Sequence, residues 1–230
     1  MTRLRSTLTF ILALVFSQIL MAQKGHLFLS GSVLSQPYQF NSSMGSFSGD
    51  ESSTPPAMQW NFGFLSPIGK SSWVWEAQLS YLHIRATETT WFRDNNNDPI
   101  LTGGFHTQHI TNELGLKAGI GYSTQSRNKK HSGIFVLGAS GYLPFLSYQN
   151  YKAGDGDWEK NRNYTDGNFE EGILYGMYLK PTYQFRIGKN NSPWSLSIFA
   201  EANLIWRNLP NYLNPIFMGG GGMGLSYTLK

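Results

Sequence analysis

The sequence predicts an all-β protein: a closed antiparallel up-and-down transmembrane β-barrel of about eight strands. Three observations predict it. Apolar residues alternate with small or polar ones in a series of segments, the connections between these segments alternate in length, and a secretory leader precedes them. The alternation is clearest at residues 173–180, which read ILYGMYLK. A period of two places successive side chains on opposite faces of a strand. Around a closed sheet, it gives one face to lipid and the other to a filled interior.

Residues 1–22 read as a signal peptide. Arg3 and Arg5 give a short positive start, residues 8–20 form the apolar middle, and Ala22 precedes a plausible cleavage point. The alternative is a single membrane anchor, but the apolar run is short for a span and is interrupted by two polar residues. The Ala-Gln junction resembles signal cleavage sites in the Bacteroidota. We therefore expect a leader at 1–22 and one outer-membrane barrel domain at 23–230.

The first four predicted strands each place apolar side chains on one face. In chain order, these strands and lipid-facing sets are 25–35 (Leu27, Leu29, Gly31, Val33), 57–65 (Met58, Trp60, Phe62, Phe64), 72–85 (Trp73, Trp75, Ala77, Leu79, Tyr81) and 108–122 (Leu114, Leu116, Ala118, Ile120). The opposite faces carry residues such as Gln59, Gln78 and Lys117. Alternation of this kind predicts half-buried strands.

The last four strands complete the barrel. They are predicted at 133–143, where 134–139 is nearly all apolar or small, at 172–186, at 194–206 and at 216–229. In 194–206, Trp194, Leu196 and Ile198 face away from Glu201 and Asn203. Alternation in the last strand is clearest at its end. Four successive glycines, 219–222, are expected to let bulky neighbours such as Phe199 fill the interior or to permit strong curvature.

The connections alternate in length. Three are short, at 66–71, 123–132 and 187–193, whereas the other four, at 36–56, 86–107, 144–171 and 207–215, are mostly much longer. Short turns at one end and long loops at the other are typical of bacterial outer-membrane barrels. An even strand count then places both termini on the short-turn side, which is the periplasm.

A soluble barrel such as a lipocalin is the main alternative, but it would carry apolar residues inside and polar ones outside. Here the polar face is rich in Gly, Ser and Gln, which suits the interior of a small barrel. Aromatic residues fall near predicted strand ends, as in membrane-interface belts: Trp60, Trp73, Trp75, Tyr81, Tyr122, Trp194, Trp206 and Tyr227.

This pattern resembles the small eight-stranded outer-membrane barrels of the OmpA and OmpX type over essentially the whole chain after the leader. The resemblance implies the cell outer membrane of a Gram-negative bacterium, with lipid and lipopolysaccharide as surroundings. Pro181 departs from a regular strand because it removes a hydrogen-bond donor on the lipid face, and a bulge there would reconcile it.

Five charged residues fall on the predicted inward face: Glu76, Glu113, Lys117, Lys180 and Glu201. Lone buried charges are costly, so partners are expected. Glu76 and Lys117 lie equally far along the chain from the middle of the connection between their strands, and so do Lys180 and Glu201. This placement favours each couple as an ion pair. We expect these pairs to be structural rather than an ion path, because eight strands leave an interior just wide enough for side chains.

Other motifs favour solvated loops over chemistry. Residues 94–98 (DNNND) resemble a calcium loop without its glycine and bidentate Glu, and 154–159 (GDGDWE) is a similar acidic stretch. His83, His106, His109 and Glu88 lie near the outer rim, where lipid-modifying barrel enzymes hold their catalytic groups, but no tight His-x-Ser arrangement occurs there. The absence of cysteine excludes disulfides and thiolate chemistry. We expect no catalytic, cofactor-binding or metal-binding residues.

Charge is sorted by end. The chain has 18 Lys and Arg, two of them in the leader, against 14 Asp and Glu. The short turns carry only bases, whereas the long loops are rich in acids. No single basic stripe runs along the chain and export is expected, so nucleic acid is excluded as a partner.

The sequence therefore predicts a non-enzymatic outer-membrane barrel. Its long loops would serve binding or structure, or the barrel would be an accessory subunit of an envelope complex with a protein partner. The alternative is a narrow pore or a laterally opening transporter of small or apolar solutes, and a lipid-modifying enzyme is a third possibility.

Overall fold

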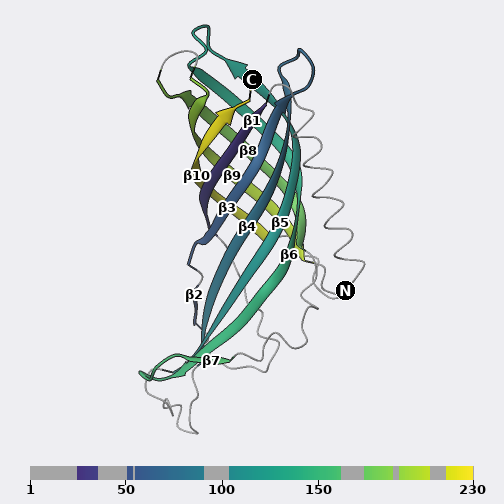
Figure 1. The fold of residues 1–230 in the computed structure, drawn as a ribbon. Helices are drawn as coiled ribbons and strands as arrows, with labels where there is room; N and C mark the ends of the chain where they lie inside the picture. The colour runs from purple at the N-terminus through teal and green to yellow at the C-terminus, as the bar shows by residue number, and fades with distance from the viewer. Residues whose placement is uncertain are drawn as a thin grey trace.

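The protein is a closed antiparallel β-barrel. The computed structural model describes residues 25–35, 51–53, 55–90, 104–161, 174–188, 192–207 and 216–229. Eight strands form the barrel: β1 (His26–Ser35), β3 (Ala57–Pro67), β4 (Trp73–Thr90), β5 (Phe105–Gln125), β6 (His131–Ala153), β8 (Leu174–Arg186), β9 (Trp194–Arg207) and β10 (Ile216–Thr228). Each pairs antiparallel with the next of these strands along the chain, and β10 pairs with β1 to close the sheet (Figure 1). The predicted up-and-down topology is confirmed.

Three neighbouring strands continue well beyond the barrel. β4, β5 and β6 have 18, 21 and 23 residues, whereas the other barrel strands have 10 to 14. Two short strands pair with their outer edges: β2 (Glu51–Ser53) with β4, and β7 (Glu159–Asn161) with β6. Together they form a five-stranded projecting sheet, β2-β4-β5-β6-β7, at the end opposite the short turns (Figure 1).

The projecting sheet corrects three predicted loops, the first being residues 36–56, which contain β2. Residues 86–107 and 144–171 were expected to be connections, yet β4 runs to Thr90, β5 begins at Phe105 and β6 runs to Ala153. The segments ATETT and FHTQH carry polar residues at successive positions, so they lack the apolar alternation that marks a lipid-facing strand. Their strand character comes from pairing with each other, which the pattern of single residues does not record.

The barrel is apolar outside and polar inside. Many of its large apolar side chains are exposed, among them Leu29, Trp60, Ile120, Met177, Ile198 and Met223. Its buried polar side chains include Ser30, Gln59, Asn61, Gln78, Ser140, Ser197 and Asn203. A barrel in water would show the reverse arrangement, whereas a barrel in lipid requires this one. Within the described residues, no helix is long and apolar enough to cross a membrane.

The bulge expected at Pro181 is not there. The β8–β9 pairing keeps one register from Leu179↔Ala202 to Thr182↔Phe199, and only the pairs in between are missing. The ladder is therefore interrupted without an inserted residue. A register shift occurs instead between Asn112 and Glu113 of β5, where one step on β5 corresponds to two on β6.

One glycine of β10, Gly222, leaves space for Phe199 as expected. A Cβ on Gly222 would lie 2.6 Å from Cζ of the inward Phe199 and 2.2 Å from the carbonyl oxygen of Gly31. The neighbouring Gly221, on the exposed face, would meet its nearest atom only at 3.3 Å. Gly222 therefore makes room for an aromatic ring in the barrel interior.

Candidate functional site: a charged layer in the barrel interior

Four buried charged side chains meet inside the barrel. Lys117 of β5 forms an ion pair with Glu201 of β9. Lys180 of β8 forms an ion pair with Glu76 of β4, with 2.6 Å between Nζ and Oε2. All four residues are almost completely buried. Lys117 also interacts electrostatically with Glu76, and Glu201 with Lys180, so the two pairs form one neutral cluster, the charged layer.

Neutral polar side chains donate further hydrogen bonds to the carboxylates. Glu76 accepts hydrogen bonds from the amide of Gln78 and from the hydroxyl of Tyr178, the latter at 3.1 Å. Glu201 accepts one from the amide of Asn203 at 2.8 Å. Buried ions are tolerated where such additional hydrogen bonds satisfy their remaining lone pairs.

Gln59 bridges Lys117 and Glu201, the two members of one ion pair. With its amide oxygen toward Lys117, Gln59 accepts from Nζ at 2.7 Å and from the Tyr142 hydroxyl at 3.1 Å. Its nitrogen then donates to Oε1 of Glu201 at 3.2 Å. This orientation places an acceptor toward Lys117 and a donor toward Glu201, because a lysine ammonium is only a donor and a carboxylate only an acceptor.

Aromatic rings surround the two ammonium groups. Lys117 Nζ lies 5.2 Å from the ring centroid of Tyr178, and Lys180 Nζ lies 4.7 Å from that of Phe28 and 5.6 Å from that of Phe199. Cations at such distances are attracted by the ring quadrupole. The aromatic filling therefore contributes to holding the lysines in place as well as excluding water.

The expected partners within this layer were wrong. Glu76 with Lys117, and Lys180 with Glu201, were predicted from their distances to the intervening connections. In the structure Glu76 is opposite Gly119 and Lys117 is opposite Gln78. Inward side chains of a small barrel converge on its axis, and tilted, staggered strands bring residues of distant strands level with each other. Each lysine therefore reaches a carboxylate across the interior, three strands away.

Glu113, the fifth predicted residue, is also buried. It lies beside the register shift of β5 and interacts electrostatically with Tyr142. It is not a member of either ion pair of the charged layer.

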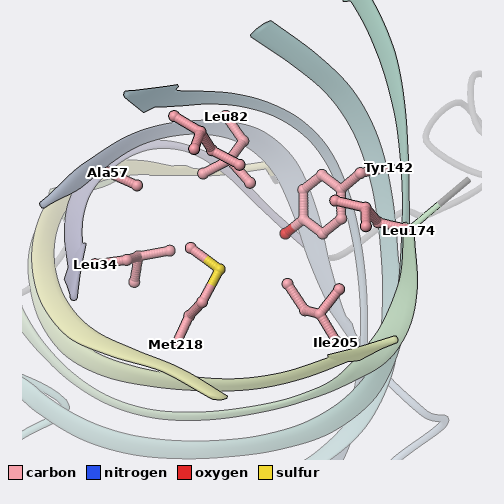
Figure 2. Close-up of a cluster of buried hydrophobic side chains, with 8 residues drawn as sticks. Leu34, Ala57, Leu82, Tyr142, Leu174, Ile205 and Met218 are labelled. Carbon is pink, nitrogen blue, oxygen red and sulfur yellow. The ribbon is translucent and has the colours of Figure 1, made fainter. Parts of the chain in front are cut away.

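Apolar clusters lie on both sides of the charged layer. Toward the projecting sheet, Figure 2 shows Leu34, Ala57, Leu82, Tyr142, Leu174, Ile205 and Met218 pointing into the interior. Toward the short turns, the cluster comprises Phe28, Leu65, Val74, Ile134, Val136 and Tyr178. Tyr142 and Tyr178 belong to these clusters, and their hydroxyls reach the polar network between them. The interior is thus layered: apolar, charged, apolar.

The residues considered as catalytic or metal-binding candidates do not come together in one site. His83 Nδ1 lies 2.8 Å from the amide oxygen of Asn112, and His106 Nδ1 lies 2.9 Å from the hydroxyl of Thr89. The side chains of Glu88 and His109 and all of residues 94–98 fall outside the described part. Asp155 and Asp157 are exposed. Among the described residues, no group of three His, Asp or Glu is arranged to hold a metal ion.

The polar and aromatic partners of the charged layer were not predicted as site residues. The inward parity of Gln59, Gln78, Tyr178 and Asn203 was readable from the alternation. What was not readable is which charged group each one contacts. Tyr142 lies at the end of the predicted strand 133–143. Because that strand is almost uniformly apolar or small, its inward and outward faces could not be assigned from the sequence.

Comparison with solved structures returns outer-membrane proteins and the translocator domain of an autotransporter. Ail of Yersinia pestis is 12% identical, with a TM-score of 0.41, over 90% of this chain and 99% of that one. OprG of Pseudomonas aeruginosa is 9% identical, with a TM-score of 0.41, over 90% and 96%. The translocator domain of the autotransporter NalP from Neisseria meningitidis is 8% identical, with a TM-score of 0.30, over 98% and 96%. No protein-family model and no curated protein matches the chain.

The architecture of the chain itself carries the assignment. Its sheet closes on itself, its outer surface is apolar, and buried polar and charged side chains lie in its interior. Lipid cannot hydrogen-bond an open sheet edge, and only a closed barrel presents such a surface to lipid without one. The chain has the architecture of a small eight-stranded outer-membrane β-barrel.

Proposed function

We propose that this protein is a non-enzymatic barrel that anchors a binding surface, the projecting sheet, outside the outer membrane. One observation carries the proposal: within the described part of the chain, the neighbouring strands β4, β5 and β6 alone extend beyond the barrel, and β2 and β7 widen them into a sheet. A barrel that served only as a pore would not need such a rigid projection. Both termini and the short turns would then lie in the periplasm.

The surface of the projecting sheet supports this role. Trp158 is exposed, lies 5.9 Å from Lys152 Nζ and 6.5 Å from the ring of His106, and stands next to β7. Phe105 and Tyr151 stack across the paired strands β5 and β6 at 6.1 Å. Exposed aromatic residues on a rigid support are typical anchors of protein interfaces. A protein of the cell envelope is the partner class that we favour, with the barrel as an accessory subunit of a complex.

Affinity purification from the native membrane tests the proposal. Tagged wild-type protein is expected to retain a stoichiometric partner, and Trp158→Ala is expected to lose most of it. Trp194→Ala, on the lipid-facing end of β9, is the matched control and should keep the partner. Recovery of the barrel alone under every condition of mild extraction would contradict an accessory role.

The layered interior also predicts that the barrel does not conduct. An ion moving along the axis would have to pass two apolar clusters and displace paired charges. Purified protein in liposomes is expected to show no steady conductance. Conductance at the level of a porin would overturn the proposal.

A second candidate is lateral passage of small apolar solutes, favoured by the interrupted ladder between β8 and β9. An apolar groove of about 620 Å³ lies there, lined by Pro181, Ile198 and the inward Phe199 among others. Uptake of an apolar solute would then be faster in cells with the protein than in a deletion strain. Pro181→Ala, which restores a backbone donor, should slow it. Equal uptake in all three strains would remove this candidate.

A further inference from the structure

The mouth of the barrel at the short-turn end contains a cavity of about 430 Å³. Its charged lining residues are Lys129 and Lys130 of the turn between β5 and β6, and Arg186 at the end of β8. Hydroxyl groups line it as well, from Ser71, Ser72, Ser123, Ser132 and Ser195. Among the described residues that line it, there is no Asp or Glu. The charged residues that line this cavity are therefore all basic, and serine hydroxyls lie beside them, with Leu65, Pro67, Val74 and Ile134 forming the apolar part of the wall.

The turn that supplies the two lysines is held in one conformation. The Lys129 amide donates to the Ser126 carbonyl at 2.9 Å, and the Lys130 amide donates to the Asn128 side chain at 3.0 Å. Backbone hydrogen bonds also join this turn to β8, where the Arg186 amide donates to the Lys130 carbonyl at 2.8 Å. Lys130 and Arg186 are thus fixed next to each other despite their equal charge.

Lys129 occupies a backbone conformation that does not favour it. Its φ is 56°, in the left-handed region, where glycine or asparagine is the usual choice. Asn128, one position earlier, accepts from the Ser126 hydroxyl and from the Lys130 amide. A glycine at position 129 would therefore relieve strain without removing these contacts.

Bases of the same turns that do not line the cavity provide a contrast. Lys70 and Arg127 are exposed in the short turns, and neither lines the cavity. General attraction to an anionic membrane surface would act on all of these residues alike. Only the concave arrangement of Lys129, Lys130 and Arg186 around hydroxyl groups can hold a discrete anion.

We propose that this cavity is a binding site for a phosphate-bearing anion. Lysine ammonium groups and serine hydroxyls are suited to phosphate oxygens, with arginine able to bind two of them at once. The phosphate group has two possible sources, a free phosphorylated compound or a phospholipid headgroup at the bilayer surface. This inference is independent of the role of the projecting sheet.

The test measures binding by amide NMR of the isotope-labelled protein in uncharged maltoside micelles. One arm titrates inorganic pyrophosphate, and the other titrates short-chain phosphatidylglycerol. The reporters are the amides of Ser123, Ser132 and Ser195, on three strands around the cavity. The site variant combines Lys129→Gly with Lys130→Gln, and the matched control combines Lys70→Gln with Arg127→Gln.

We expect saturable shifts at all three reporters, weakened about tenfold or more in the site variant because two charge-assisted contacts are lost, and nearly unchanged in the control. Lys129→Gly relieves backbone strain, so the melting temperature of that single variant should not fall, which separates lost binding from lost folding. A response to pyrophosphate identifies a free anion as the source, and a response to phosphatidylglycerol alone identifies the headgroup. The absence of saturable shifts in both arms, or equal weakening in both variants, would overturn the proposal.

Discussion

Two lysines and two glutamates are removed from water in the middle of the barrel, and each is stabilised by an opposite charge and by neutral donors or aromatic rings. Pairing does not make such residues more stabilising than apolar ones of the same size. Its consequence is asymmetry: removing one partner leaves the other charge buried, whereas removing both relieves the problem. A double substitution at the charged layer should therefore destabilise the barrel less than the single one.

Glu201→Gln should lower the free energy of unfolding by about 3–5 kcal/mol, since it leaves Lys117 without its counter-charge. The double variant Lys117→Met, Glu201→Gln should recover part of that loss. Urea titration in detergent, followed by the heat-modified mobility of the folded barrel on gels, measures both. Unchanged unfolding of the single variant would show that the pair is not buried as described.

The crossed pairing has its own test. A double-mutant cycle on Lys117 and Glu201 should give a coupling energy of roughly 0.5–3 kcal/mol, as expected for residues in direct contact. The control cycle uses Lys180 and Glu201, which lie opposite each other in the β8–β9 register but form no ion pair with each other. A larger coupling in the control cycle would restore the pairing expected from sequence.

Gly222 and Gly221 give a matched pair of substitutions on one strand. Gly222→Ala should destabilise the barrel by about 1–3 kcal/mol, because the new Cβ must displace Phe199 and the backbone of β1. Gly221→Ala should change stability by less than ~1 kcal/mol, since its side chain enters the exposed face. The same urea titration compares them. Equal effects of the two substitutions would show that the interior at Phe199 is loosely filled.

At the scale of elements, each barrel strand has to satisfy two solvents at once. β9 illustrates this: Ile198 is 67% exposed on the outer face, whereas Glu201, three residues on, is buried in the interior. The projecting ends of β4, β5 and β6 have no lipid to face, so their composition changes while the backbone pairing continues. The change from apolar alternation to polar residues along these strands therefore marks where the bilayer ends.

A charged side chain on the lipid face should destabilise the barrel more strongly the closer it lies to the bilayer midplane. Ile198→Lys should make folding into phospholipid bilayers less favourable by about 2–4 kcal/mol, the value for a basic residue near the bilayer midplane. Asp155→Lys, in the exposed turn after β6, introduces the same side chain in water and should have little effect. Folding into vesicles, followed by tryptophan fluorescence, provides the comparison. A barrel that tolerates Ile198→Lys as well as the control would not have this face in lipid.

At the scale of the whole molecule, one end of the barrel carries short turns with bases and the other carries the projecting sheet. An epitope inserted near Asp157 should be labelled on intact cells, and one inserted beside Lys129 should be labelled only after the outer membrane is opened. Protease added to intact cells should likewise spare the turn at 123–132. Labelling of the second site alone would invert the proposed orientation. A protein found free in the periplasm would exclude the membrane assignment.

The sequence alone determined the eight barrel strands and the face on which most of their residues lie. It did so because inward and outward positions depend on parity within one strand, which is a local property. It placed Glu76, Lys117, Lys180 and Glu201 on the inward face for this reason. It missed the polar ends of β4, β5 and β6, where both faces meet water and parity carries no signal.

Only the tertiary structure decided which inward residues meet. The contact between Lys117 and Glu201 spans three strands, and its existence depends on the tilt and stagger with which the sheet closes. The same closure gathers the short turns around the cavity at the mouth and aligns β2 and β7 along the edges of the projecting sheet. Such contacts join residues far apart in the chain, and periodicity within a strand contains no information about them.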